Sequence, residues 1–117
     1  MLKKTKLRLI SLACVLGAAS LQPVFAQSSS GTTTIKQIDT GWSSDTFGVM
    51  TAAPVLNPAG CTATDMYESS QPAAGYSTFY AAALTAFSTG SQVVIIVSNT
   101  TCTQNRPTIM GIYLVNP

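Results

Sequence analysis

Short runs of apolar residues, separated by polar and turn-forming residues, follow one another along most of the chain. Such runs, rich in β-branched and aromatic residues, predict several short strands. The run Val93–Val97 is β-branched throughout, which is typical of a central strand buried on both faces. The other predicted strands span about Ile35–Trp42, Thr46–Ala53, Cys61–Glu68 and Ile109–Val115. In the last of these, Met110, Ile112 and Leu114 alternate with Ile109, Gly111 and Tyr113, so each set defines one face.

One segment instead has helical periodicity. Its apolar residues recur at i, i+3, i+4, i+7, i+8 and i+11, and alanines fill most of the remaining positions. These residues are Tyr76, Phe79, Tyr80, Ala83, Leu84 and Phe87. Gly90 follows where a left-handed residue would end the helix. We interpret the stripe as the core face, although an aromatic stripe is also suited to a ligand groove.

Turn signals divide the strands and set their order. Asn57–Gly60 (Asn-Pro-Ala-Gly) is the strongest of them, and Ser98–Pro107 has the composition of a loop. The predicted order is therefore β-β-β-α-β-β. For five short strands and one helix, the natural fold is mainly β, a small partly closed barrel capped by the helix.

The N-terminal segment has the pattern of a secretory signal. Basic residues are followed by an apolar stretch over 9–19 and by Val24-Phe25-Ala26 before Gln27. The apolar stretch is too short for a membrane span of about 20 residues. We expect residues 1–26 to be a signal peptide, 27–34 a flexible leader and 35–117 the folded domain, located in the periplasm or outside a bacterial cell. Lipid attachment at Cys14 is the alternative, although Ser11 stands where a large aliphatic residue would be expected.

Two cysteines, Cys61 and Cys102, follow that signal, and a pair has only one connectivity. In an oxidising compartment we expect them to form a structural disulfide. A redox-active pair is the alternative, but active pairs usually have C-x-x-C spacing and cationic neighbours.

The charge of the chain excludes several classes of function. The formal charge of the whole chain is +2, but without residues 1–26 two basic residues face four acids, which gives −2, and no histidine is present. This balance argues against nucleic-acid binding, a histidine metal site and a Ser-His-Asp triad. We find no phosphate loop, dinucleotide motif or nucleophile elbow, so we expect no cofactor and no metal, and not an enzyme. Asp65 and Glu68, the closest acidic pair, would lie on opposite faces of a strand as solvated acids.

Candidate ligand-binding residues lie in two polar segments. Trp42, the only tryptophan, is followed closely by Ser44 and Asp45, a combination suited to stacking on a sugar and bonding its hydroxyls. Trp42 is equally suited to plug a barrel. The second segment contributes Asn99, Asn105 and Arg106, next to Cys102. A solvated loop without a binding role is the alternative there.

The last half of the chain resembles known secreted proteins. The predicted order of elements is that of the OB-fold, and Ala82–Val97 resembles the helix-to-strand passage of B subunits of secreted bacterial toxins. The ending Pro107–Ile112 is similar as well. A group of small bacterial secreted proteins also shares Gly60-Cys61, the Ser-x-Gly-x-x-Val passage Ser88–Val93, and Cys102 before Pro107. The toxin B subunits are OB-folds that form rings of five and bind host glycans, so the resemblance implies a pentamer and a glycan ligand.

Three functions follow from these observations. The first is a secreted or periplasmic, non-catalytic module that binds a glycan or a protein through residues of the two polar segments. The alternative is a structural or envelope accessory protein that only self-associates or contacts another protein. An enzyme would require a partner subunit to supply the catalytic groups. Because charged residues make up only 9% of the chain, its surface tolerates self-association, and we expect a homo-oligomer.

Overall fold

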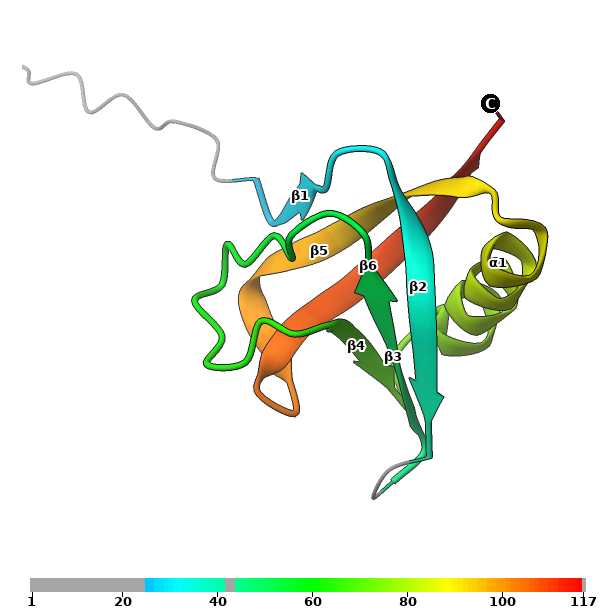
Figure 1. Ribbon diagram of the computed structural model, residues 1–117. Helices are drawn as coiled ribbons and strands as arrows, with labels where there is room; N and C mark the ends of the chain where they lie inside the picture. Colours follow the sequence, from blue (N-terminus) through cyan, green and yellow to red (C-terminus); the bar gives the residue numbers. More distant parts are fainter. Residues whose placement is uncertain (1–24, 42–43, 117) are drawn as a thin grey trace, which may run out of the picture.

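The computed structural model describes residues 25–41 and 44–116 (Figure 1). The element order is six strands and one helix: β1 Gln27–Ser29, β2 Thr33–Thr40, β3 Thr46–Thr51, β4 Tyr67–Ser70, α1 Tyr76–Thr89, β5 Gln92–Thr103 and β6 Arg106–Val115. From β2 onward this is the predicted β-β-β-α-β-β order. Over residues 25–41 and 44–116 the fold is mainly β with one helix and one disulfide, as the sequence predicts.

The six strands form one sheet that curls part of the way into a ring. Antiparallel pairs join β2 to β3, β3 to β4 and β5 to β6, and the ring is continued by a parallel pairing of β4 with β6. That parallel pairing consists of one registered pair, Glu68 with Thr108, and β2 meets β5 at only two positions. The sheet is therefore partly ringed and does not close into a barrel.

The core lies between the curled sheet and α1, which packs against β2 and β6 (Figure 1). Phe47, Val49, Tyr67, Ile95 and Ile109 are among its fully buried side chains. The aromatic rings of Tyr76 and Tyr80 contact Phe47, with centroids 5.4 and 5.2 Å away.

The helix begins and ends at left-handed glycines. Gly75 has φ 83° and Gly90 has φ 70°, and a Cβ on Gly75 would clash with the ring of Phe79. The predicted helix and its ending at Gly90 are confirmed. The prediction that the whole apolar stripe faces the core is wrong for Leu84 and Phe87, which are 39% and 47% exposed. Ala86 is buried in their place, because the contact face rotates along the helix.

The residues expected to form a flexible leader instead lie along the edge of β5. β1 pairs with Val97 and its neighbours, and Ser30 exchanges hydrogen bonds with the backbone of Ile95. Polar composition indicated flexibility, but a strand edge offers unpaired backbone groups to any extended neighbour.

Two predicted boundaries are wrong. The third strand, expected over Cys61–Glu68, is β4 and begins only at Tyr67, because 52–66 form a loop. Within that loop the side chain of Asn57 bonds both the backbone N–H and the carbonyl of Cys61, which confirms the predicted turn. The loop expected at Ser98–Pro107 is mostly strand, with a tight turn at Gln104 and Asn105.

The faces predicted for the last strand are also wrong. Ile96 pairs with Gly111 and Val97 with Ile109, so Met110 is an extra residue that bulges out of β6. A one-residue bulge reverses the inward-facing set, and Ile109 and Ile112 therefore both pack against the core.

Candidate ligand-binding site

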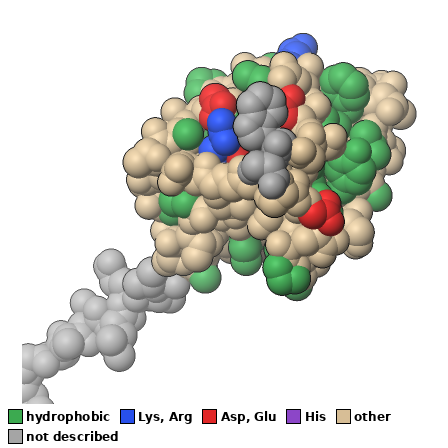
Figure 2. Space-filling view, turned by 90° about the horizontal axis from the view of Figure 1, so that it is seen from below, with side chains coloured by type: hydrophobic (Ala, Val, Ile, Leu, Met, Phe, Trp, Pro, Cys, Tyr) green, Lys and Arg blue, Asp and Glu red, His purple; other side chains and the backbone are tan. Residues whose placement is uncertain are grey.

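A pocket of about 220 Å³ opens on the outer face of the sheet, where β2, β3 and β4 meet the β5–β6 turn. Its lining is mostly polar. The lining residues are Asp39, Thr40, Thr46, Gly48, Asp65, Met66, Glu68, Gln104 and Arg106. Figure 2 shows acidic and basic side chains gathered on one face of the molecule.

Strand register explains why these residues converge. Asp39 pairs with Gly48, Gly48 with Glu68, and Glu68 with Thr108, so the four form one row across β2, β3, β4 and β6. Directly paired residues project on the same face of a sheet. Asp39 and Glu68 are separated by two strand spacings, about 10 Å between backbones. Gly48 lies between these two carboxylates and contributes no side chain of its own.

Met66 fills the space above Gly48. A Cβ on Gly48 would clash with Sδ of Met66 and lie 3.3 Å from its Cγ. Met66 is itself buried. The pocket therefore combines an apolar floor, formed by the thioether, with carboxylates on both sides.

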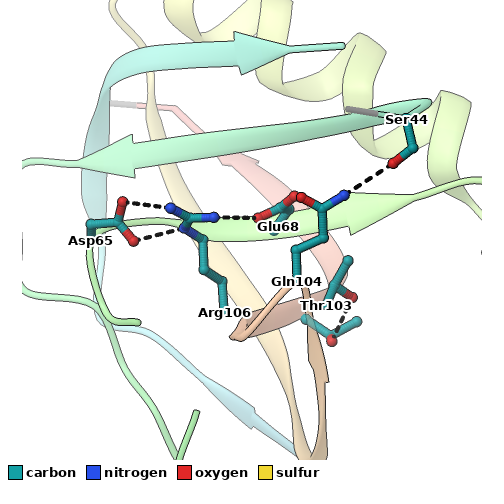
Figure 3. Close-up of polar contacts among 7 residues, drawn as sticks. Ser44, Asp65, Glu68, Thr103, Gln104 and Arg106 are labelled. Atoms are coloured by element: carbon teal, nitrogen blue, oxygen red, sulfur yellow. Dashed lines mark hydrogen bonds and ion pairs between the residues drawn. The ribbon is translucent and has the colours of Figure 1, made fainter. Parts of the chain in front are cut away.

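Among the residues that the structure describes, Arg106 is the only cation that lines the pocket. Its Nε donates to Asp65 at 2.7 Å and its Nη2 donates to the other oxygen of Asp65 at 3.0 Å. Its Nη1 donates to Glu68 at 3.2 Å. Figure 3 shows the guanidinium lying between the two carboxylates. This bidentate and bridging geometry fixes the direction of all three side chains.

The two acids differ in protonation behaviour because their surroundings differ. Hydrogen bonds from Arg106 hold the pKa of Asp65 below its ordinary value. Burial raises the pKa of Glu68, and Arg106 only partly opposes that effect. Asp65 in turn raises the pKa of Arg106, which stays charged.

The prediction that Asp65 and Glu68 lie on opposite faces of a strand is wrong, and of the two only Asp65 is exposed to solvent as expected. Asp65 precedes β4, so the alternation of a strand does not apply to it, and both acids contact one arginine. Glu68 is only 4% exposed. Asp39, Asp65, Glu68 and Gln104 were missed as site residues, since their proximity depends on pairing between distant strands.

The predicted site residues separate into groups. Arg106 lines the pocket, and Ser44 accepts a hydrogen bond from the pocket residue Gln104 at 3.0 Å. Asp45 lies outside the lining and accepts a hydrogen bond from the hydroxyl of Tyr76. Trp42 falls outside the described residues.

The other two candidates have structural contacts. Asn99 bonds the N-terminal segment, through the carbonyl of Phe25 and the hydroxyl of Ser28. Asn105 has φ 66° in the β5–β6 turn, and its carbonyl accepts a hydrogen bond from Ala63 at 2.9 Å. Neither residue lines the pocket.

The disulfide supports one wall of the site. Cys61 and Cys102 are joined with Cα atoms 5.8 Å apart, as predicted, and the bond ties the loop 52–66 to the β5–β6 hairpin. Asp65 comes from that loop and Arg106 from that hairpin. The bond between Ala63 and Asn105 strengthens the same junction.

Residues 25–41 and 44–116 contain no group of three or more acidic, histidine or cysteine side chains placed to hold a metal ion. Over the same ranges, no helix is both long and apolar enough to cross a membrane. No family model, curated protein or solved structure matches this chain. The resemblance to toxin B subunits stays a prediction.

Proposed function

We propose that this protein is a secreted or periplasmic, non-catalytic binding module that holds a carbohydrate in the pocket beside Arg106. The observation that carries the proposal is the position of the pocket. In the OB-like order, β3 and β4 are the second and third strands, and the pocket lies on their face next to the turns that join β2 to β3 and β5 to β6. Folds of this type bind oligonucleotides and oligosaccharides on that face, between those two loops.

Charge separates these two ligand classes. Three carboxylates and one guanidinium line the pocket, so its formal charge is −2 when all are ionised. Phosphate backbones are bound by arginine and lysine side chains that neutralise them. The only arginine here is already bonded to Asp65 and Glu68. A carbohydrate, which offers hydroxyl donors to carboxylates, fits the pocket better.

The N-terminal pattern and the disulfide support export of the protein. The absence of catalysis is supported by the state of the acids. Asp65 is held in the charged form by Arg106, and Glu68 uses one oxygen to bind the same guanidinium. In a glycosidase, one carboxyl group must protonate the leaving group and the other must attack the sugar or activate a water molecule, whereas Asp65 and Glu68 are both bonded to one guanidinium.

Binding is tested on a glycan array with the protein recovered from the periplasm of an expressing bacterium. Thr40 is exposed and lines the pocket, so Thr40→Phe should fill the pocket and reduce binding at least tenfold. Thr100→Phe is the matched control, since Thr100 is an exposed strand residue outside the lining. A ligand found in this way should also shift the emission of Trp42, the only tryptophan, and should be released unchanged. Equal binding by both variants would show that this pocket is not the binding site.

The alternative, a protein that serves self-assembly or contact with another protein, is favoured by a different observation. Large apolar side chains are exposed on α1 and β6, two elements that pack against each other. They are Leu84, Phe87, Met110, Tyr113 and Leu114, each 39% to 59% exposed. A variant that no longer self-associates but still binds glycans fully, or one that self-associates but no longer binds glycans, would distinguish the two functions.

A further inference from the structure

The pocket offers a ligand mainly hydrogen-bond acceptors. Asp39 and Glu68 lie on the two sides of Gly48 in one row of the sheet. An ionised carboxylate only accepts hydrogen bonds. Asp39 accepts one from the side chain of Gln37 and Glu68 accepts one from Arg106, so each keeps further acceptor positions for donors on the ligand. The guanidinium of Arg106 already directs three of its N–H groups to Asp65 and Glu68.

The same groups disfavour a negatively charged ligand. An anion placed between Asp39 and Glu68 would face two like charges in a partly desolvated site, where repulsion is weakly screened. Arg106 offsets only part of this repulsion, because one positive charge faces three carboxylates and is already paired with Asp65 and Glu68. A hydroxyl or an ammonium group meets no such penalty.

The floor and size of the pocket add a shape requirement. Met66 lies across Gly48, so the surface between the two carboxylates is an apolar thioether. Sulfur and methylene groups make favourable contacts with apolar ring faces. The volume of about 220 Å³ lies below the range of about 300–1,000 Å³ that is usual for pockets holding drug-sized ligands, which suits a single sugar ring.

Building on the proposed carbohydrate function, we propose that the pocket takes one neutral or amino-substituted sugar ring and rejects sugars that carry carboxylate, sulfate or phosphate. An apolar face of the ring rests on Met66, and hydroxyl or ammonium donors of the ring bond Asp39 and Glu68. Arg106 is a positioning residue that orients Glu68 and Asp65, and it does not hold an anionic group of the ligand.

The test is a panel of neutral oligosaccharides, chitosan oligomers with free amines, sialylated glycans and sulfated glycans, bound to the exported protein. We expect binding only among the neutral and amino members. Chitosan oligomers and their N-acetylated counterparts separate the two donor sources, because only the former carry ammonium groups and lose affinity as salt rises. Asp39→Asn should reduce binding of the best ligand at least fivefold. Asp45→Asn is its matched control, since it removes the same charge outside the lining.

Different outcomes overturn different statements. Best binding to sialylated or sulfated glycans, lost on removal of the acidic group, would overturn this inference and leave carbohydrate binding intact. Equal loss of affinity in Asp39→Asn and Asp45→Asn would overturn the role of Asp39. No binding to any member of the panel would overturn the proposed function as well.

Met66→Leu should retain binding and Met66→Gln should weaken it, with Met110→Gln, on the exposed bulge of β6, as control.

Discussion

Arg106 and Glu68 form a contact on which stability should depend, because a nearly buried carboxylate is paired with one guanidinium. Arg106→Ala should lower the free energy of unfolding by about 3 kcal/mol at pH 7, since it leaves an unpaired buried charge. The loss should shrink as the pH falls. The folded-state pKa of Glu68 is raised, so Glu68 becomes neutral on acidification before the unfolded chain does, and its burial then costs less.

Asp65 shifts the pH dependence of this loss in the same direction. The folded-state pKa of Asp65 is lowered, so its pairing with Arg106 contributes stability at pH values above its ordinary pKa of 3.8. That contribution disappears as the pH falls through the lowered pKa. Thermal unfolding of the protein and of Arg106→Ala at pH 7 and at about pH 2.5, below the ordinary pKa of both acids, measures the combined effect. An equal difference in Tm at both pH values would contradict it, and the double variant with Glu68→Gln should recover part of the loss at pH 7.

Ser69 and Ser98 are two buried serines that differ in hydrogen bonding. Ser69 is fully buried, and its Oγ has no partner among the described residues. Ser98 Oγ accepts the backbone N–H of Thr101 at 3.0 Å. Ser69→Ala should therefore stabilise the protein by about 1 kcal/mol, whereas Ser98→Ala should destabilise it by a similar amount. Denaturant unfolding compares the two, and destabilisation by both would show that Ser69 has a partner.

At the scale of elements, the disulfide should link stability to binding. It closes a separation of 41 residues, so the double variant Cys61→Ser with Cys102→Ser should lose about 4 kcal/mol by the loop-entropy estimate. Binding should weaken too, because the loop that carries Asp65 is released from the hairpin that carries Arg106. Thermal unfolding and glycan titration, each with and without reductant, measure the two effects. Reductant should not affect the double variant. Unchanged binding in that variant would show that the disulfide does not support the binding site.

Elements set by local pattern were predicted well, and those set by pairing between distant segments were not. The helix follows from apolar residues three and four apart and from Gly90, all within fifteen residues. The site instead requires the register across β2, β3, β4 and β6, including a parallel pairing of Glu68 with Thr108. The bulge at Met110 reverses one strand face, and no local signal marks it. Among the candidates that the structure describes, Arg106 alone is also a pocket residue.

At the scale of the whole molecule, few charges and several exposed apolar side chains favour self-association. We expect light scattering of the purified protein, without reductant, to give a multiple of the mass of one chain. Tyr113 is 59% exposed on β6, so Tyr113→Lys should shift the mass towards that of one chain by placing a charge in the contact. Thr100→Lys, at an exposed position of β5, is the control for added charge and should not change the mass.

The number of subunits decides between assembly models. An assembly of five subunits would support the ring that the resemblance to toxin B subunits implies. A different number of subunits would support self-association without that ring. A mass of one chain at every concentration would contradict both. The pocket faces away from the core, on the opposite side of the sheet from α1, and Arg106 begins β6 whereas Tyr113 lies near its end. An assembly through α1 and the exposed apolar residues near the end of β6 therefore leaves the pocket open. Tyr113→Lys should therefore bind a single sugar unit as tightly as the unmodified protein, but should bind a surface coated with many copies of that sugar at least tenfold more weakly, because linked sites raise avidity.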